Sequence, residues 1–173
     1  MIETERLKLI PFTRQHYEVI LKNDNVSLGK LLEVETPESW SVDKNAKEAI
    51  PALIGFFESL KGDTSWGSYF IILQKQHKLI GSCGFKGNPD FDNYVEIGYE
   101  IHPSFQSRGF GTEAAKALID FAFTKNISGI KAHTLREENN SVHILQKLGF
   151  TFQGEIELMG EGPLWYWLLP KQT

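Results

Sequence analysis

Cysteine and long apolar runs are scarce in this sequence. Cys83 is the only cysteine among 173 residues, so no internal disulfide can form and a reducing cytoplasm is the expected location. Uncharged apolar stretches such as 69–73 are far too short to cross a bilayer. Acids and bases alternate near the N-terminus, where a secretory signal needs an unbroken apolar region. These absences predict a protein with neither a disulfide framework nor a membrane partner.

Basic clusters are missing as well. The chain carries 18 Lys and Arg against 22 Asp and Glu, a formal net charge of −4, and it has no run of Lys and Arg. A nucleic-acid partner requires a basic surface that neutralises phosphates, so none is expected. The five histidines show no paired spacing typical of metal ligands, and we expect no metal site. A net acidic protein favours cationic ligands such as amines.

The residues that are present indicate one domain over 1–173 with a mixed α/β (α+β) fold. Hydrophobic residues make up 41% of the chain, and no repeat or evident linker divides it. Strands that are first joined by turns and then alternate with helices are typical of a mixed sheet flanked by helices. The hydrophobic pattern predicts strands near 7–9 and at 68–74, 78–86, 94–101, 131–135, 150–157 and 164–169, and helices at 13–23, 41–61 (broken at Pro51), 109–125 and 141–148.

The most informative segment is a predicted strand, Tyr94–Ile101, followed by a loop that opens a helix. Gly109 and Gly111 stand where that helix begins. The first amides of a helix lack internal partners and carry partial positive charge, and glycine lets an anion approach them closely. The pattern therefore predicts a phosphate cradle. A tight turn into an amphipathic helix fits the glycines alone equally well.

Two kinds of phosphate ligand are disfavoured. The loop lacks the Gly-Lys-Ser/Thr ending of a P-loop, which argues against phosphoryl transfer. Residues 109–114 formally match the dinucleotide fingerprint G-x-G-x-x-A, but several residues separate them from the strand. That fingerprint also requires an acid about 20 residues further on, where this chain has 131–133, Lys-Ala-His. A dinucleotide-binding protein is therefore the less favoured alternative.

Two motifs carry a family resemblance. The stretch Gln106-Ser-Arg-Gly-Phe-Gly111 resembles the Q/R-x-x-G-x-G/A coenzyme A signature of the GNAT superfamily of N-acetyltransferases. Residues 96–114 resemble its branch of ribosomal-protein N-terminal acetyltransferases, and 134–141 with 146–150 resemble the second motif of that branch, in the right order and separation. The resemblance implies the GNAT fold, whose mixed central sheet is splayed between the strands near 94–101 and 131–135.

The same resemblance implies the activity. Such enzymes move an acetyl group from acetyl-coenzyme A, their co-substrate, directly to a primary amine within a ternary complex. The acceptor is a protein N-terminus or a small-molecule amine, and the sequence does not choose between them. A non-catalytic coenzyme A-binding module of the same fold is the alternative function. We expect a monomer or a homodimer.

The resemblance also assigns residues to the coenzyme. The pantetheine arm would pair with the exposed edge of the strand, and the pyrophosphate would lie on the amides where the helix begins. Asn139 and Asn140 belong to the second motif, where they either bind the pantetheine arm or only cap the helix after them. The coenzyme-binding residues implied are Ile97, Tyr99, Ile101, Gln106, Arg108, Gly109, Phe110, Gly111, Thr112, Asn139 and Asn140.

Glu96 and Ser141 are the predicted catalytic residues. Period two places Glu96 with Gly98 and Glu100 on one strand face. An amine nucleophile must lose a proton, and a partly desolvated glutamate with a raised pKa suits that task. Similar enzymes often use a glutamate on this strand, although a solvated strand face explains it as well. Ser141 is the candidate, by position, to return a proton to the coenzyme thiolate.

Overall fold

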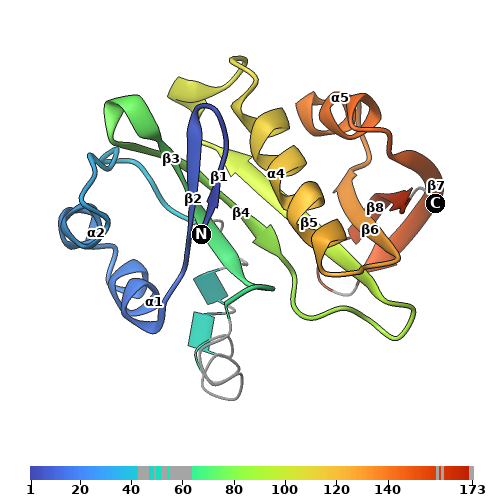
Figure 1. Cartoon of the computed structure of the whole chain (residues 1–173), viewed down its shortest axis with the longest axis horizontal. Coiled ribbons are helices and arrows are strands. Elements are labelled where there is room, and N and C mark those ends of the chain that lie inside the picture. The colour runs from blue at the N-terminus through green and yellow to red at the C-terminus, as the bar shows by residue number, and fades with distance from the viewer. Residues whose placement is uncertain are drawn as a thin grey trace.

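One mixed β-sheet dominates the structure (Figure 1). The computed structural model of the chain describes residues 1–42, 47, 48, 50, 51, 54, 64–158, 160 and 162–171. Within them the sheet has eight strands in the order β1-β2-β3-β4-β5-β6-β8-β7. The strands are β1 (Ile2–Glu3), β2 (Leu7–Pro11), β3 (Ser68–Leu73), β4 (Lys78–Phe85), β5 (Tyr94–Ile101), β6 (Gly129–Leu135), β7 (Thr151–Leu158) and β8 (Gly162–Pro170), and the helices are α1 (Arg14–Leu21), α2 (Asn25–Leu32), α4 (Phe110–Thr124) and α5 (Asn140–Lys147).

One strand and one α-helix were not predicted, β1 and α2, and neither were the short 3-10 helices η1 (Gln74–Gln76) and η2 (Pro103–Phe105). Asn23 adopts a left-handed conformation, and Asp24 then caps a new helix through its side chain. The helix predicted over 13–23 therefore ends at Leu21, and α2 follows it. The helix predicted over 41–61, with its break at Pro51, lies mostly outside the described residues; those described within 43–61 (47, 48, 50, 51 and 54) are helical. The other predicted strands and helices are confirmed within a few residues of their bounds.

Helices cover both faces of the sheet, and β3 shows the two sides. Its Tyr69 and Ile71 pack in the core beneath α4, whereas Phe70 and Ile72 pack in a second core beneath α1 and α2. This is the alternation expected of a strand buried on both faces. Figure 1 shows α4 lying across β4 and β5, with α5 beside its N-terminal half. The predicted mixed sheet flanked by helices is confirmed.

The sheet splits between β5 and β6. These parallel strands pair only at Tyr94–Gly129, Val95–Ile130 and Glu96–Lys131. Beyond Glu96, β5 stays paired with β4 through Ile101, while β6 stays paired with β8 through Leu135. The facing edges of β5 and β6 therefore part, which confirms the predicted splay. Any ligand that enters this gap meets strand backbone without a strand partner.

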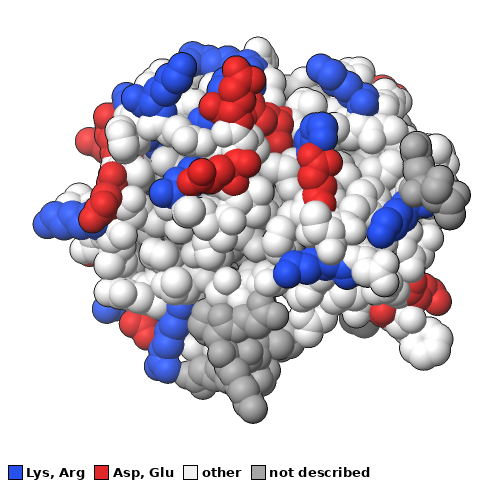
Figure 2. Space-filling view, viewed as in Figure 1, with Lys and Arg blue, Asp and Glu red and all other residues white. Residues whose placement is uncertain are grey.

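The face of the molecule seen in Figure 2 carries charges of both signs. Acidic and basic side chains are interspersed on the face seen in Figure 2, with no large patch of one sign among the residues coloured there. None of the helices in the described part of the chain is long and apolar enough to cross a membrane.

The close approach of β4 to β5 predicts how two glycines tolerate a methyl group. A Cβ on Gly81 would lie 2.1 Å from the Glu100 carbonyl oxygen, a backbone atom that cannot swing away, whereas a Cβ on Gly98 would meet nothing within 4 Å. We expect Gly81→Ala to lower the free energy of unfolding by about 1–3 kcal/mol. Gly98→Ala should change it by less than about 0.5 kcal/mol. Urea unfolding of both variants measures this, and equal losses would contradict the β4–β5 packing.

Candidate functional site

The loop after β5 ends at a helix that has no side-chain cap. Gln106 ties the loop to the strand, because its Nε2 donates to the Ile101 carbonyl at 2.8 Å. Gly109 is the N-cap of α4 with φ of 80°, a left-handed conformation that favours glycine. The first α-helical bond of α4 runs from Glu113 N to Gly109 O at 3.0 Å. The amides of 110–112 precede that bond, so they remain available to an anion.

The odd-numbered residues of β5 turn their backbone groups toward the gap. Glu96 O accepts from Lys86 N at 2.9 Å, and His102 N donates to Ile80 O at 2.8 Å. Backbone groups of alternate residues point to opposite sides of a strand, so the even-numbered residues face β4. The N–H and C=O groups of 97, 99 and 101 consequently face the side where β6 has parted. These are the strand residues that the sequence predicted for the coenzyme.

A groove of about 350 Å³ joins the uncapped helix to this strand edge. One wall comes from β5 and the loop after it, and the other comes from α5. Its lining residues are Tyr99, Glu100, Ile101, Phe105, Gln106, Ser107, Gly109, Phe110, Gly111, Thr112, Asn140, Ser141, His143, Ile144 and Lys147. The fold therefore brings most of the predicted coenzyme residues, and Ser141, to one place.

Three predicted coenzyme residues are not in that lining. Ile97 is buried in the core beneath α4, so only its backbone faces the gap. The Arg108 guanidinium lies over the Phe105 ring, 5.8 Å from its centroid. Asn139 caps α5, its Oδ1 accepting from the amides of 141 and 142 at 2.9 and 3.1 Å. Asn140 rather than Asn139 lines the groove.

Lys147 lines the groove although the sequence did not predict it, and Tyr99, a predicted coenzyme residue, lines it too. Lys147 lies on the same face of α5 as Asn140 and His143, a helical spacing that would have revealed it once α5 was placed against the loop. The Tyr99 hydroxyl donates to the Ser141 carbonyl at 3.3 Å and so bridges β5 and α5. Burial raises the pKa of Tyr99, so its phenol is protonated at neutral pH.

Glu96 lies at the point where β5 and β6 part, and it has two cationic or hydrogen-bonding neighbours. Its Oε1 is 2.6 Å from Lys86 Nζ and 2.8 Å from His133 Nδ1. The His133 ring in turn stacks on Tyr166, with centroids 5.4 Å apart. Among the described residues, none is bonded to Glu96 Oε2. One carboxylate oxygen is therefore held in place while the other is free to meet a substrate.

The predicted raised pKa of Glu96 is wrong. Burial alone raises the pKa of this carboxyl, but the hydrogen bonds from His133 and Lys86 outweigh burial and hold the pKa below its ordinary value. Glu96 is therefore ionised at neutral pH. An ionised carboxylate can only accept, so His133 donates through Nδ1–H.

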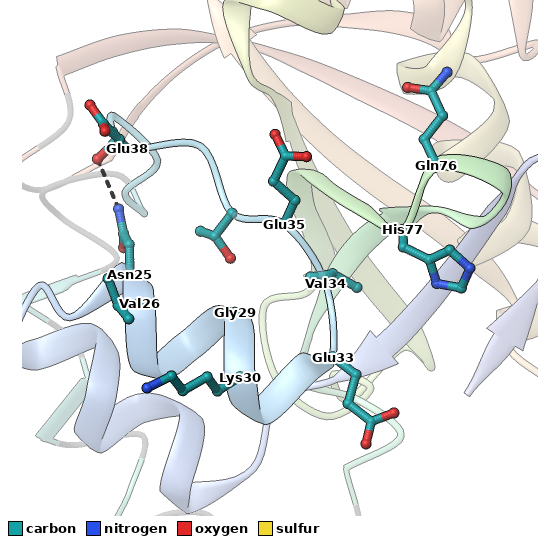
Figure 3. Close-up of a pocket in the computed structure, with 11 residues that line it drawn as sticks. Asn25, Val26, Gly29, Lys30, Glu33, Val34, Glu35, Glu38, Gln76 and His77 are labelled. Atoms are coloured by element: carbon teal, nitrogen blue, oxygen red, sulfur yellow. Dashed lines mark hydrogen bonds between the residues drawn. The ribbon is translucent and has the colours of Figure 1, made fainter.

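A second, larger cavity of about 570 Å³ lies between α2, the segment after it and the turn between β3 and β4 (Figure 3). Its rim carries both signs, since Lys30 and Glu35 line it, and Glu35 pairs with Lys78 at 3.2 Å. Asp24 caps α2 by accepting from Ser27 N at 2.9 Å, and a carboxylate at a helix N-terminus opposes an anion. The smaller groove, with its uncapped amides, suits a phosphate-bearing ligand better.

Known proteins resemble this chain in sequence and in fold. A family model described as an acetyltransferase (GNAT) domain matches residues 6–151. An uncharacterized N-acetyltransferase of Bacillus subtilis (strain 168), YjdG, is 30% identical over 151 residues, which cover 87% of this chain and 89% of that protein. The spermidine N(1)-acetyltransferase of Escherichia coli (strain K12) is 37% identical over 57 residues, 32% of this chain and 31% of that one.

A solved structure agrees in fold. The ribosomal-protein-S5-alanine acetyltransferase from Vibrio fischeri matches with a TM-score of 0.65 and 18% identity, over 97% of this chain and 94% of that chain. At this identity the likeness shows the fold alone.

The contacts of Glu96 predict its titration. Its carboxyl pKa, followed by carbon NMR of the side chain, should lie below the ordinary glutamate value of about 4.3. The contact therefore stabilises the fold above about pH 4.3 and loses that effect as pH falls through the folded-state pKa. His133→Ala and Lys86→Met should each raise the pKa, because burial remains. Lys116→Met, which breaks an exposed pair with Asp120, is the matched control. A wild-type pKa above the ordinary value would contradict the Glu96 contacts described here.

Proposed function

Because the chain belongs to the GNAT family of acetyltransferases, which use acetyl-coenzyme A, we propose that it transfers the acetyl group directly to a primary amine at the splay between β5 and β6. The observation that carries this proposal is the placement of an uncapped helix N-terminus beside an unpaired strand edge, in one groove. Together these offer amides for a pyrophosphate and a strand edge for a pantetheine arm, the two recognition elements that coenzyme A presents.

The residues present fit the coenzyme. Amides of 110–112 would bind the pyrophosphate, and Lys147 at the groove wall adds a positive charge. The backbone of 97 and 99 and the N–H of 101, whose carbonyl already accepts from Gln106, would pair with the pantetheine amides. Gln106 holds the loop against the strand end, and Asn140 and Ser141 supply polar groups from α5. When bound, the coenzyme supplies an activated acetyl thioester and a thiolate leaving group.

Glu96 is proposed to accept the proton that the amine loses as its nitrogen is acylated. Its Oε2 is the free oxygen, and it lies on the strand that flanks the gap. The lowered pKa makes Glu96 a weak base, so its part is to attract an ammonium ion and to take the proton, directly or through water, as the amine reacts. His133 and Lys86 fix Oε1 and thereby orient Oε2.

Ser141 is proposed to donate a hydrogen bond to the departing thiolate and to relay to it a proton that the hydroxyl takes up from water. It lines the groove at the first turn of α5, and its carbonyl is held by the Tyr99 hydroxyl. An ordinary thiol titrates near about 8.5, so its thiolate leaves without needing a strong acid. Removal of the Ser141 hydroxyl is therefore expected to matter less than removal of the Glu96 charge.

Cys83 supports direct transfer rather than an acetyl-enzyme. It is the only cysteine, and its side chain is buried in β4 beneath α4. Burial raises the pKa of the Cys83 thiol, so little nucleophilic thiolate forms at neutral pH. A ternary complex, in which the amine attacks the bound thioester, needs no such nucleophile.

The acceptor class is tested by transfer itself. We expect the protein to release coenzyme A thiol from acetyl-coenzyme A when given primary amines, and a panel of polyamines, amino acids, amino-sugars and N-terminal peptides identifies the preferred one. Glu96→Gln keeps the shape of the side chain but removes its charge, so kcat should fall by about 100-fold or more. The affinity for acetyl-coenzyme A should stay close to that of the wild type, because the amides of 110–112 are unchanged.

Glu100→Gln is the control for this variant, since Glu100 shares the strand face but lies further along β5. It should mainly raise KM for cationic acceptors. Part of the Glu96→Gln loss should be recovered at high pH, where more free amine exists. Full turnover by Glu96→Gln at pH 7 would remove Glu96 from the mechanism. Coenzyme binding by the wild type without transfer to any amine would favour the non-catalytic module instead.

A further inference from the structure

One carboxylate on the first turn of α4 binds residues of the turn between β1 and β2. Glu113, in that first turn, accepts from Arg6 Nε at 2.6 Å through Oε2. Its Oε1 accepts from the Arg6 backbone amide at 3.0 Å and from Thr4 Oγ1 at 2.5 Å. These contacts join residues more than 100 positions apart in the sequence. They fix the N-terminal hairpin against the helix that would bind the pyrophosphate.

The same guanidinium also holds the loop. Arg6 Nη1 donates to the Arg108 carbonyl at 3.1 Å, immediately before the N-cap Gly109. Its carbon Cζ lies 4.5 Å from the centroid of the Phe110 ring. A Cβ placed on Gly109 would lie 3.4 Å from Arg6 Nη2. One side chain thus contacts the residues before and after the N-cap and leaves little room for a side chain at the N-cap itself.

Glu113 carries a charge where an anion is expected to bind. Burial raises the pKa of this carboxyl, but the bonds from Thr4 and Arg6 outweigh burial and hold the pKa below its ordinary value. A carboxylate in the first turn competes with a phosphate for the positive end of the helix and repels it. Arg6 offsets that charge while leaving the amides of 110–112 uncovered.

We propose that Arg6 is a positioning residue for the coenzyme loop: it neutralises Glu113 and, by holding the Arg108 carbonyl, keeps the α4 amides turned toward the groove. This inference rests on the proposed coenzyme site. Arginine suits both tasks because its planar fork can bond a carboxylate and a carbonyl at once. A lysine ammonium is a point charge that can neutralise Glu113 but does not reproduce the fork.

Calorimetry with coenzyme A tests this proposal on the full chain. Arg6→Gln should raise Kd by about 5- to 30-fold, the range for a partly buried charge at a helix terminus. Arg6→Lys should fall between it and the wild type. Glu113→Gln removes the repelling charge, so it should bind at least as tightly as the wild type. In Arg6→Gln/Glu113→Gln, affinity should recover part of what Arg6→Gln lost, because the unpaired carboxylate is gone while the bond to the Arg108 carbonyl is still missing.

Steady-state kinetics distinguish a role of Arg6 in coenzyme binding from a general effect of Arg6 on the stability of the fold. Arg6→Gln should raise KM for acetyl-coenzyme A and leave kcat at saturation within about twofold, because the reacting groups are untouched. Lys116→Gln is the control: it removes one positive charge that pairs with an acid, on α4 one turn after Glu113, and its coenzyme affinity should not change. A merely structural contact would lower the melting temperature of the double variant further and would not restore its affinity.

Three results would overturn the inference: an unchanged Kd for Arg6→Gln, a double variant as weak as Arg6→Gln, or Glu113→Gln that binds more weakly than the wild type. The last needs no Arg6 variant, so it decides the question even where Arg6→Gln fails to fold. Failure of the wild type to bind coenzyme A would instead refute the proposed function, and this inference with it.

Discussion

The parting of β5 from β6 after Glu96 is the constraint on which the candidate site depends. Buried backbone groups need partners, and a sheet that closed completely would satisfy them internally. Here β5 keeps β4 on one side and offers 97, 99 and 101 on the other. The chain returns from that strand through a loop that ends at Gly109, so an uncapped helix begins beside the open edge. Because β5 and β6 stop pairing after Glu96, one groove contains both an open strand edge and the uncapped start of α4.

Because the strands part after Glu96, the proposed proton acceptor lies next to the strand edge that is proposed to bind the coenzyme. Glu96 stands at the last paired position, where its carboxylate meets Lys86 from the end of β4 and His133 from β6. Those neighbours make it a fixed, charged group rather than a carboxyl poised near neutral pH. Arg6 makes a parallel contribution at the first turn of α4, where it neutralises Glu113. In the proposed mechanism, both sites work through charges held in position by partners distant in sequence.

Hydrophobic alternation, helical spacing and glycine positions predicted the elements that depend mainly on residues close together in the sequence. Alternation located β5 within its bounds, and glycines with helical spacing located α4. The start of α2 was missed because Asp24 caps it inside a short polar stretch that follows α1 without a long loop. The pKa of Glu96 was predicted in the wrong direction because its partners, His133 on β6 and Lys86 just after β4, come from other parts of the chain. Arg6 was not singled out, because a hairpin and a helix N-terminus meet only in the folded chain.

We propose that coenzyme A lies in the splay rather than in the larger cavity beside α2. Amide hydrogen exchange with and without saturating coenzyme A tests it most directly, because it reports protection peptide by peptide. Coenzyme A bound in the splay should slow exchange at 97–101, at 109–113 and at the start of α5, and leave α1 unchanged. Protection confined to 25–36, or none at 97–101 while coenzyme A is bound, would contradict it.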